Sequence, residues 1–290
     1  MQSDELSGLA AAPRAEGDKQ RLHRIMLALG DVRLAEVGQE AVDNVRAKIL
    51  KPDASPATIL RGVVSPIRAV MRHGHRRSWC DAPMFEVPKQ PQGRTRFLLP
   101  AEAERLIAAA APHVRPLLIV LLTTGARMSE AIELLWRDVD LVSARVIFWR
   151  TKGGRRRVAT LPPRAVAALA NLPEREGPVF RWQTPRSKRS SAYVDRGRRE
   201  GGQIKTAWHG ALRRAQLDPD LTPHDLRHTW ATWHYALYRD LLLLKAEGGW
   251  SSVTLVERYA HLMPRGEEAT IRHFGHQADT ALPERTASAQ

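Results

Sequence analysis

A stretch rich in proline, glycine and charge, Pro88 to Arg96 (PKQPQGRTR), interrupts the apolar pattern of this chain. It offers no apolar face that a helix or strand could bury, which is typical of a linker between domains. The sequence predicts a flexible leader (residues 1–18), a first domain (19–87), this linker (88–96), a second domain (97–264) and a C-terminal tail (265–290).

The first domain is predicted to be all-helical. Apolar residues recur at helical spacing up to Gly30, and a second helix is expected at residues 40–50. Ser55 followed by Pro56 has the order of an N-cap and a first helical residue, so a third helix should begin there. Pro66 is expected to bend that helix, because proline lacks the backbone N–H that continues the hydrogen-bond ladder. The predicted inward face of the third helix consists of Ile59, Val63, Ile67, Val70 and Met71.

The opposite face of this third helix and the residues after it are rich in arginine. A helix that packs inward on one side and presents guanidinium groups on the other is suited to contact phosphates. The candidate DNA-binding residues of the first domain are Arg61, Arg68, Arg72, Arg76 and Arg77.

The second domain is predicted to be mainly helical with one small sheet. Apolar periodicity indicates helices over residues 100–110, 114–122, about 129–136 and again from 204 onward. Residues 145–150 (RVIFWR) and 155–160 (RRRVAT) are β-prone, and residues 151–154 (TKGG) between them favour a hairpin. The expected fold is therefore mainly α with a small antiparallel β-sheet, in the α+β class.

The net charge of +14 is concentrated in two regions of the sequence. Residues 141–210 carry +12, residues 61–80 carry +5, and all other residues together carry −3. Such a basic chain favours a polyanionic partner such as nucleic acid. The stretch 185–199 is interpreted equally well as part of a nucleic-acid-binding patch and as a merely solvated face or flexible tail. The candidate DNA-binding residues of the larger region are Arg155, Arg156, Lys188 and Arg189.

Several classes of protein fit this sequence poorly. No apolar run approaches the roughly 18 residues that a membrane span requires, and the first residues, MQSDELSG, do not resemble a signal peptide. Cys80 is the single cysteine, which excludes an intramolecular disulfide and a cysteine-rich zinc site. We expect no metal site and a cytoplasmic location.

The segment LTPHDLRH, residues 221–228, has the pattern of a helix start that holds an anion. Thr222 is expected to be the N-cap, and Asp225 is a favourable carboxylate in the first turn. His224 and Arg227 are three residues apart, so they share one face at the positive amino end of the helix. A phosphodiester could bind there, although for this motif alone an ordinary cap beside a surface cation is the favoured interpretation.

Two further cations stand in informative places. Arg127, in TTGARMSE, follows an apolar helix and precedes Ser129, which is interpreted as a helix cap. An arginine beside a helical core needs a partner, and both Glu130 at i+3 and a bound phosphate are candidates. Lys152 lies in the predicted hairpin turn, where an ammonium can swing towards a ligand and donate a proton or can simply be solvated.

The segment GGWSSVTLVERYAH, residues 248–261, contains Trp250 and Tyr259. Alone, such a tyrosine is usually a core or interface residue. In order and spacing, however, TGxRxSE, the turn lysine, HxLRH, the tryptophan and YxH together resemble the tyrosine recombinase, or phage integrase, family. The resemblance extends over about residues 97–264.

This resemblance implies an enzyme that cleaves and rejoins DNA strands through a covalent 3′-phosphotyrosyl intermediate. It implies that Arg127 and Arg227 hold the scissile phosphate, that His224 assists by hydrogen bonding and proton transfer, and that Tyr259 is the nucleophile. The family acts without cofactors.

Three more roles follow from the resemblance. Lys152 would protonate the leaving 5′ oxygen, and Glu130 would support the arginine and histidine arrangement. Trp250 departs from the usual family pattern, because histidine is more common at this position. Its indole N–H can donate to a phosphate oxygen but cannot transfer a proton as an imidazole does.

The resemblance also suggests how the protein assembles. Residues 55–79 are similar to the core-binding helices of the family, which implies a two-domain clamp around double-stranded DNA. A homotetramer on two synapsed duplexes is expected, with a monomer possible in the absence of DNA. Residues 267–276 of the tail would then dock on a neighbouring protomer or fray.

The sequence leaves alternatives to a site-specific recombinase open. A type IB topoisomerase-like enzyme would share the tyrosine chemistry but relax a single duplex. A catalytically silent DNA-binding accessory protein would keep the fold, and a basic helix-turn-helix regulator would bind DNA only. The DNA target, and the choice among integration, excision, resolution and inversion, cannot be deduced from these residues.

Overall fold

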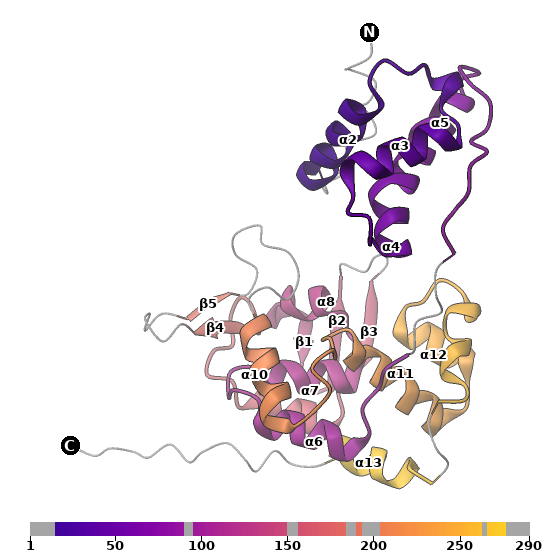
Figure 1. Ribbon diagram of the computed structural model, residues 1–290. Helices are drawn as coiled ribbons and strands as arrows, with labels where there is room; N and C mark the ends of the chain where they lie inside the picture. The colour runs from indigo at the N-terminus through magenta and orange to yellow at the C-terminus, as the bar shows by residue number, and fades with distance from the viewer. Residues whose placement is uncertain are drawn as a thin grey trace. The chain divides into compact units, whose positions relative to one another are not determined.

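The computed structural model describes residues 15–89, 95–149, 156–183, 190–192, 204–262 and 266–276 of the chain (Figure 1). The chain divides into two units, Met1–Gly93 and Arg94–Gln290. Helices dominate both units, and the second also contains a three-stranded antiparallel sheet. The predicted class, mainly α with a small antiparallel sheet, is confirmed. Among the described residues, no helix combines the length and the apolar composition that crossing a membrane requires.

The first unit is built from short helices. Its elements are α2 (Ala15–Leu29), α3 (Gln39–Ile49), α4 (Pro56–Ile59), a π-helical turn η2 (Leu60–Val64) and α5 (Ser65–His75). Ser55 Oγ accepts a hydrogen bond from Thr58 N at 3.2 Å, which confirms the predicted cap. The helix contains a π turn directly before Pro66, in which Ser65 N donates to Leu60 O five residues back. The proline cannot donate to the carbonyl four residues before it, so the ladder shifts by one residue there.

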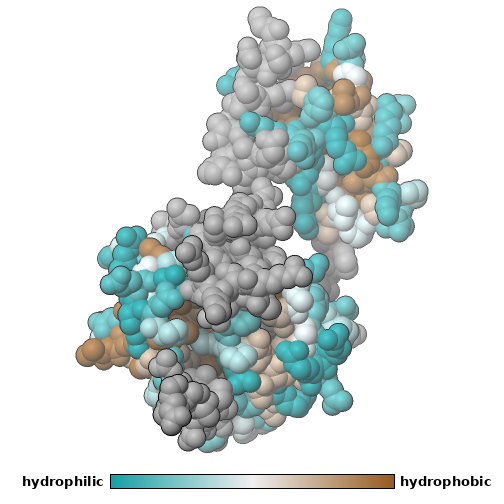
Figure 2. Space-filling view, turned by 90° about the vertical axis from the view of Figure 1, so that its left-hand side faces the viewer, coloured by the Kyte–Doolittle hydropathy of each residue, from teal (hydrophilic) through white to brown (hydrophobic). Residues whose placement is uncertain are grey.

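The core of the first unit lies between α2, α3 and the α4–α5 segment. Val45 and Val63 are fully buried, and Ile67 and Met71 pack with them. Apolar side chains also reach the surface, as Figure 2 shows where brown residues lie among teal ones on this unit; the most exposed hydrophobic residues of α2 and the loop after it are Met26, Leu27 and Val32.

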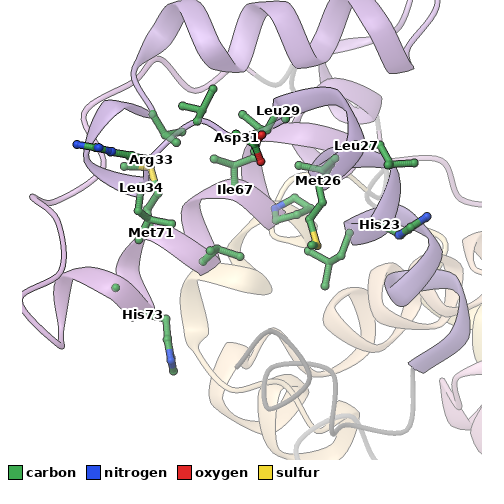
Figure 3. Close-up of a pocket in the computed structure, with 18 of the residues that line it drawn as sticks. His23, Met26, Leu27, Leu29, Asp31, Arg33, Leu34, Ile67, Met71 and His73 are labelled. Atoms are coloured by element: carbon green, nitrogen blue, oxygen red, sulfur yellow. The ribbon is translucent and has the colours of Figure 1, made fainter. Parts of the chain in front are cut away.

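A groove of about 650 Å³ opens between α2 and α5 in this unit (Figure 3). Met26 and Leu29 line it from α2, Leu34 from the 3₁₀ turn η1 (Leu34–Glu36), and Ile67 and Met71 from α5. The lining of this groove is mainly apolar.

The core of the second unit surrounds α7 (Arg115–Thr124). Leu117 to Leu122 are each at most 1% exposed, as expected of a helix that is apolar on all sides. The helices packed around this core are α6 (Pro100–Ala109), α9 (Pro163–Ala170), α10 (Lys205–Ala215), α11 (Asp225–Tyr238) and α13 (Glu268–His276). Leu98 N donates to Thr229 Oγ1 and Trp233 Nε1 donates to Leu98 O, each at 3.0 Å, which fixes α11 to the beginning of the unit.

The sheet has the strand order β1 (Val139–Asp140), β2 (Arg145–Phe148) and β3 (Arg157–Thr160). The antiparallel pairing of the two predicted strands is confirmed, with Arg145 opposite Thr160 and Phe148 opposite Arg157. Val146, Phe148 and Arg157 are buried, so the face that meets the core includes a charged side chain. A second pair, β4 (Arg181–Gln183) with β5 (Ser190–Ala192), was not predicted.

The helix predicted at residues 129–136 is wrong in extent. The structure has a short α8 (Met128–Ile132) and then the 3₁₀ turn η3 (Trp136–Asp138). The chain leaves the helix because Trp136 N bonds to Gly177 O and Val179 N bonds to Leu134 O, which pairs this segment with a distant one. The predicted cap at Ser129 is also wrong, since the N-cap is Arg127.

Gly125 ends α7 in the left-handed region, with φ of 60°. A Cβ placed on it would lie 2.1 Å from Cε3 of Trp230 on α11, so a side chain meets both backbone strain and a collision with a buried ring.

We predict that Gly125→Ala lowers the free energy of unfolding by about 2 to 5 kcal/mol, the sum of the left-handed conformation and overpacking. Gly30 has a similar φ of 66° but no atom within 4 Å of an added Cβ, so Gly30→Ala isolates the cost of the backbone conformation. Urea unfolding of both variants checks this. Equal losses would show that the contact with Trp230 contributes nothing.

Candidate active site

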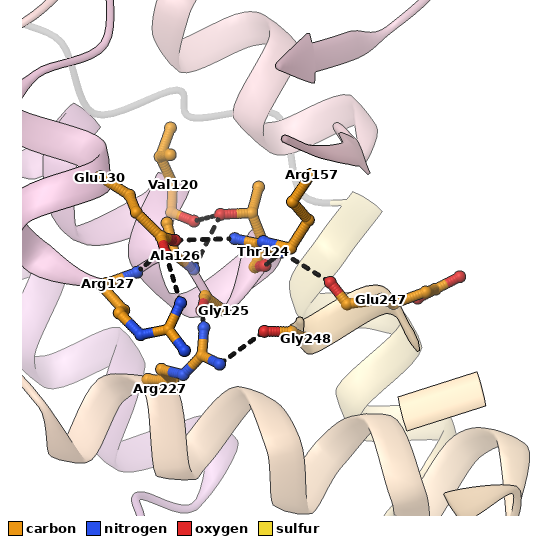
Figure 4. Close-up of polar contacts among 10 residues, drawn as sticks. All are labelled: Val120, Thr124, Gly125, Ala126, Arg127, Glu130, Arg157, Arg227, Glu247 and Gly248. Atoms are coloured by element: carbon orange, nitrogen blue, oxygen red, sulfur yellow. Dashed lines mark hydrogen bonds and ion pairs between the residues drawn. The ribbon is translucent and has the colours of Figure 1, made fainter. Parts of the chain in front are cut away.

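Three arginines from separate elements converge near the end of α7 (Figure 4). Arg127 precedes α8, Arg157 begins β3 and Arg227 lies in the first turn of α11. Arg127 Nη1 pairs with one carboxylate oxygen of Glu130, and Arg157 Nη2 lies 3.3 Å from the other. The i+3 ion pair expected between Arg127 and Glu130 is thus present.

Glu130 is the anionic centre of this cluster. Its side chain is fully buried, and its carboxylate also accepts a hydrogen bond from Arg127 N at 3.0 Å, which satisfies the start of α8. Burial alone would raise the pKa of Glu130. The hydrogen bond from Arg127 and the charges of Arg157 and Arg127 outweigh burial and hold the pKa of this carboxyl below its ordinary value.

Arg157 and Arg227 satisfy the carbonyls at the ends of two helices. Arg157 Nη1 donates to Thr124 O at 3.0 Å and to Glu247 O at 2.8 Å, at the ends of α7 and α12 (Leu241–Gly248). Arg227 donates to the next carbonyl of each helix, Gly125 O and Gly248 O. Both guanidinium groups therefore bind the negative ends of helix dipoles.

Arg227 is 2% exposed, and burial together with the charges of Arg127 and Arg157 lowers the pKa of its guanidinium. An arginine nevertheless stays protonated at neutral pH. The guanidinium groups of Arg127, Arg157 and Arg227 outnumber the nearby carboxylates of Glu130 and Glu247. The cluster therefore carries excess positive charge, which favours an anionic ligand.

His224 stands at the amino end of α11, as its N-cap residue. The predicted cap by Thr222 is wrong in direction: Thr222 N and Oγ1 donate to the Asp225 carboxylate at 2.7 and 2.8 Å, so Asp225 is the acceptor. The packing around His224 and the charge of Arg227 lower the pKa of its imidazole, and Asp225 opposes them. At neutral pH His224 is a neutral group beside fixed cations.

Tyr259 lies in a 3₁₀ turn, η5 (Glu257–Tyr259), and is 2% exposed. Its hydroxyl oxygen is 2.7 Å from Nδ1 of His228 on α11. Burial raises the pKa of the Tyr259 phenol, and the charges of Arg258 and Arg227 oppose that rise.

The ring of Trp250 joins Tyr259 to Arg227. The Arg227 guanidinium carbon lies 4.2 Å from the centre of this ring, and the Tyr259 ring centre is 5.8 Å from it. The contact with Arg227 uses the ring face, which adds a cation–π interaction to the hydrogen bonds of the guanidinium.

The structure therefore brings together most of the predicted catalytic residues, namely Arg127, Glu130, His224, Arg227, Trp250 and Tyr259. Lys152, with Arg155, Lys188 and Arg189, lies outside the described residues. Arg156 is exposed beside β3.

Two residues of this site, Arg157 and His228, were not predicted from the sequence. Strand alternation would place Val158 on the buried face and Arg157 in solvent, whereas the structure buries Arg157 and exposes Val158. His228 is four residues after His224, so the two share a helix face. Its contact with Tyr259 spans 31 positions and has no local signal.

The arginines predicted on the first unit differ in accessibility. Arg61, Arg72, Arg76 and Arg77 are exposed, whereas Arg68 is half-buried and its Nε is enclosed without a hydrogen-bond partner. Arg68 is thus less available to a ligand than the sequence suggested.

Comparisons with known proteins agree on one family. The sequence pattern of the Phage integrase family matches residues 96–265. The chain is 30% identical over 243 residues to the integrase of Salmonella phage P22, covering 81% of this chain and 62% of that relative. It is 30% identical over 217 residues to tyrosine recombinase XerC of Xanthomonas axonopodis pv. citri (strain 306), covering 72% of this chain and 65% of that relative.

The chain thus spans less than two thirds of the length of these two relatives. Among solved structures, a lambda integrase(75-356) dimer bound to a COC' core site has a TM-score of 0.66 at 16% identity, with 90% of this chain and 94% of that chain covered. At this identity the likeness concerns the fold.

We predict that Glu130→Gln changes how stability depends on pH. Because the folded pKa of Glu130 is lowered, its carboxylate stabilises the fold above the unfolded pKa of about 4.3, and this contribution disappears as the pH falls through the folded pKa. At pH 7 the free energy of unfolding of the variant should be lower by about 3 to 5 kcal/mol, because buried cations lose their partner. As the pH falls, the free energy of unfolding of the variant should decrease less steeply than that of the natural chain.

Urea unfolding at a series of pH values measures both effects. Glu176 is exposed in the same unit, and Glu176→Gln should stay within about 0.5 kcal/mol of the natural chain. Parallel acid profiles for the natural chain and Glu130→Gln would contradict the prediction.

Proposed function

The chain belongs to the Phage integrase family, and on that premise we propose that it is a site-specific DNA recombinase that cleaves and rejoins strands through a covalent 3′-phosphotyrosyl intermediate. One observation carries the proposal: a buried guanidinium, Arg227, lies beside Arg127 and reaches the Tyr259 phenol through the ring of Trp250. Integration and excision are the biological outcomes proposed for this chemistry.

In the proposed reaction the scissile phosphate binds to Arg127 and Arg227. The transition state places extra negative charge on the non-bridging oxygens, and fixed guanidinium groups stabilise that charge without moving. Arg227 is held by carbonyls of two helices, and Arg127 by Glu130, so both are oriented before DNA binds. His224 would donate a hydrogen bond to the same phosphate.

The Tyr259 oxygen then attacks phosphorus, and the bond to the 5′ oxygen breaks. The leaving 5′ oxygen takes a proton, for which Lys152 is the proposed donor. A phenol has a pKa of about 10 and is a better leaving group than an alcohol, so a free 5′ hydroxyl can reverse the step. The bond energy is conserved in the phosphotyrosyl link, and the proposed chemistry draws on no cofactor.

The proposed partner is double-stranded DNA, held in a clamp to which both units contribute basic side chains. A homotetramer on two synapsed duplexes is the proposed working assembly. The proposed location is the cytoplasm, in association with the nucleoid, for a protein encoded by a bacterium or a phage. A lambda integrase of similar fold is described as a dimer bound to its core site.

Two alternatives make different predictions. A type IB topoisomerase-like enzyme would relax a plasmid that lacks any special site, whereas a recombinase yields site-dependent products. A silent accessory protein would bind DNA without forming an adduct. The retained cluster of arginines with a tyrosine favours turnover over silent binding.

We predict that Tyr259→Phe abolishes covalent adducts while DNA binding stays within about twofold, because the change removes one buried hydroxyl. The probes are duplexes selected by the full chain from a random-sequence pool, then nicked at successive positions so that cleavage traps the adduct. Mass spectrometry of the DNA-linked peptide identifies the attacking residue. The matched control, Tyr235→Phe, should form adducts normally; attachment at a residue other than Tyr259 would refute the proposal.

We also predict that Arg72→Ala with Arg76→Ala weakens binding uniformly across DNA sequences. Each lost phosphate contact reduces the magnitude of the slope of log affinity against log salt concentration by about 0.9. The slope of the double variant should therefore be smaller in magnitude by about 1.8. Binding titrations at several salt concentrations measure the slope. Arg33→Ala with Arg46→Ala removes the same charge from exposed positions of the same unit, and an equal effect there would show that only net charge matters.

A further inference from the structure

His228 forms a hydrogen bond with the proposed nucleophile, Tyr259. Its Nδ1 lies 2.7 Å from the Tyr259 hydroxyl oxygen, and its ring is half-buried one residue after Arg227 on α11. The ring of His224 meets it edge-on, with centres 4.8 Å apart. The side chain that touches the nucleophile is thus an imidazole, and the proposed roles of the other residues leave it unassigned.

We propose that His228 accepts the proton of Tyr259 during strand cleavage. The inference rests on the proposed function and specifies one of its steps. The Tyr259 O–H bond breaks, a bond forms between the proton and Nδ1 of His228, and the phenolic oxygen forms its bond to phosphorus. In the reverse reaction the same proton returns to the tyrosine oxygen as the phosphotyrosyl bond breaks.

The surroundings of His228 keep the acceptor free of a proton before DNA binds. Burial and the neighbouring His224 lower the pKa of His228 to about 4, so its imidazole is neutral at physiological pH. The titratable and charged groups facing it are His224, Asp225, Arg227, Arg258 and Tyr259. Of these, Asp225 favours the charged imidazole, and the cations oppose it.

Such a weak base can still take the proton of a phenol for two reasons. A bound phosphodiester brings negative charge next to His228, which raises the pKa of the imidazole. The tyrosine proton also becomes far more acidic as its oxygen bonds to phosphorus, so the transfer becomes favourable during the attack. Since Tyr259 is 2% exposed, bulk water has little access to do the same.

The test is single-turnover cleavage of the selected, nicked duplexes as a function of pH. In the natural chain the rate should level off once His228 is neutral. His228→Asn keeps an acceptor near the Nδ1 position but cannot take a proton, so cleavage at pH 7 should fall roughly 100-fold or more. Its rate should then rise about tenfold per pH unit, because only the small fraction of Tyr259 that is already ionised can attack.

A duplex with sulfur in place of the leaving 5′ oxygen separates the two proton transfers. Sulfur leaves without protonation, so the defect of His228→Asn should persist on this probe; its disappearance would place His228 on the leaving group and overturn the proposal. A pH profile that is parallel to that of the natural chain would also overturn it, because a purely positioning role lowers the rate equally at all pH values.

A second variant covers the case in which His228→Asn does not fold. His228→Ala leaves space beside the tyrosine, and added imidazole should restore cleavage in proportion to its basic form; absence of rescue in folded protein contradicts the proposal. The exposed His209 on α10 gives the control, and His209→Asn should match the natural chain. If the natural chain forms no adduct, the proposed function itself fails, whereas an adduct with an unchanged profile in His228→Asn rejects only this inference.

Discussion

The site depends on two buried arginines that bind the ends of two helices. Arg157 bonds to Thr124 O and Glu247 O, and Arg227 bonds to the carbonyls that follow each of these. The last carbonyls of a helix have no partner within it, and burying them without one is costly. Each arginine therefore stabilises the junction of α7 with α12 and is oriented by it, so the same bonds serve the fold and the proposed phosphate site.

In this arrangement the arginines provide fixed positive charge, and the histidines are the groups that can take up a proton. The arginines stay charged, whereas packing lowers the pKa of both His224 and His228. Neutral imidazoles can accept protons, and they avoid adding charge to an already cationic cluster. Glu130, buried between two guanidinium groups, keeps the cluster from being purely cationic.

Local sequence signals predicted the features that local chemistry determines. The cap at Ser55, the pairing of the hairpin strands and the Arg127–Glu130 pair all depend on residues close in sequence. Long-range contacts explain the failures: α8 ends early because the chain after it pairs with residues near 178. The bond between His228 and Tyr259 likewise joins segments that only the folded chain brings together.

The position of Gly248 has a consequence for any exchange of parts between related chains. This residue supplies a carbonyl to Arg227, and an added Cβ would lie 1.8 Å from Cζ3 of Trp250. From Gly248 the chain continues through two short turns to Tyr259, and His234 Nε2, 2.8 Å from Glu247 Oε2, fastens the preceding helix to α11. The carbonyl that binds Arg227 and the tyrosine therefore belong to one continuous segment of the chain. In a chimeric protein that takes Tyr259 from a related chain, the exchanged segment would have to begin before Glu247. Otherwise the contacts of Glu247 and Gly248 that position the tyrosine would be lost.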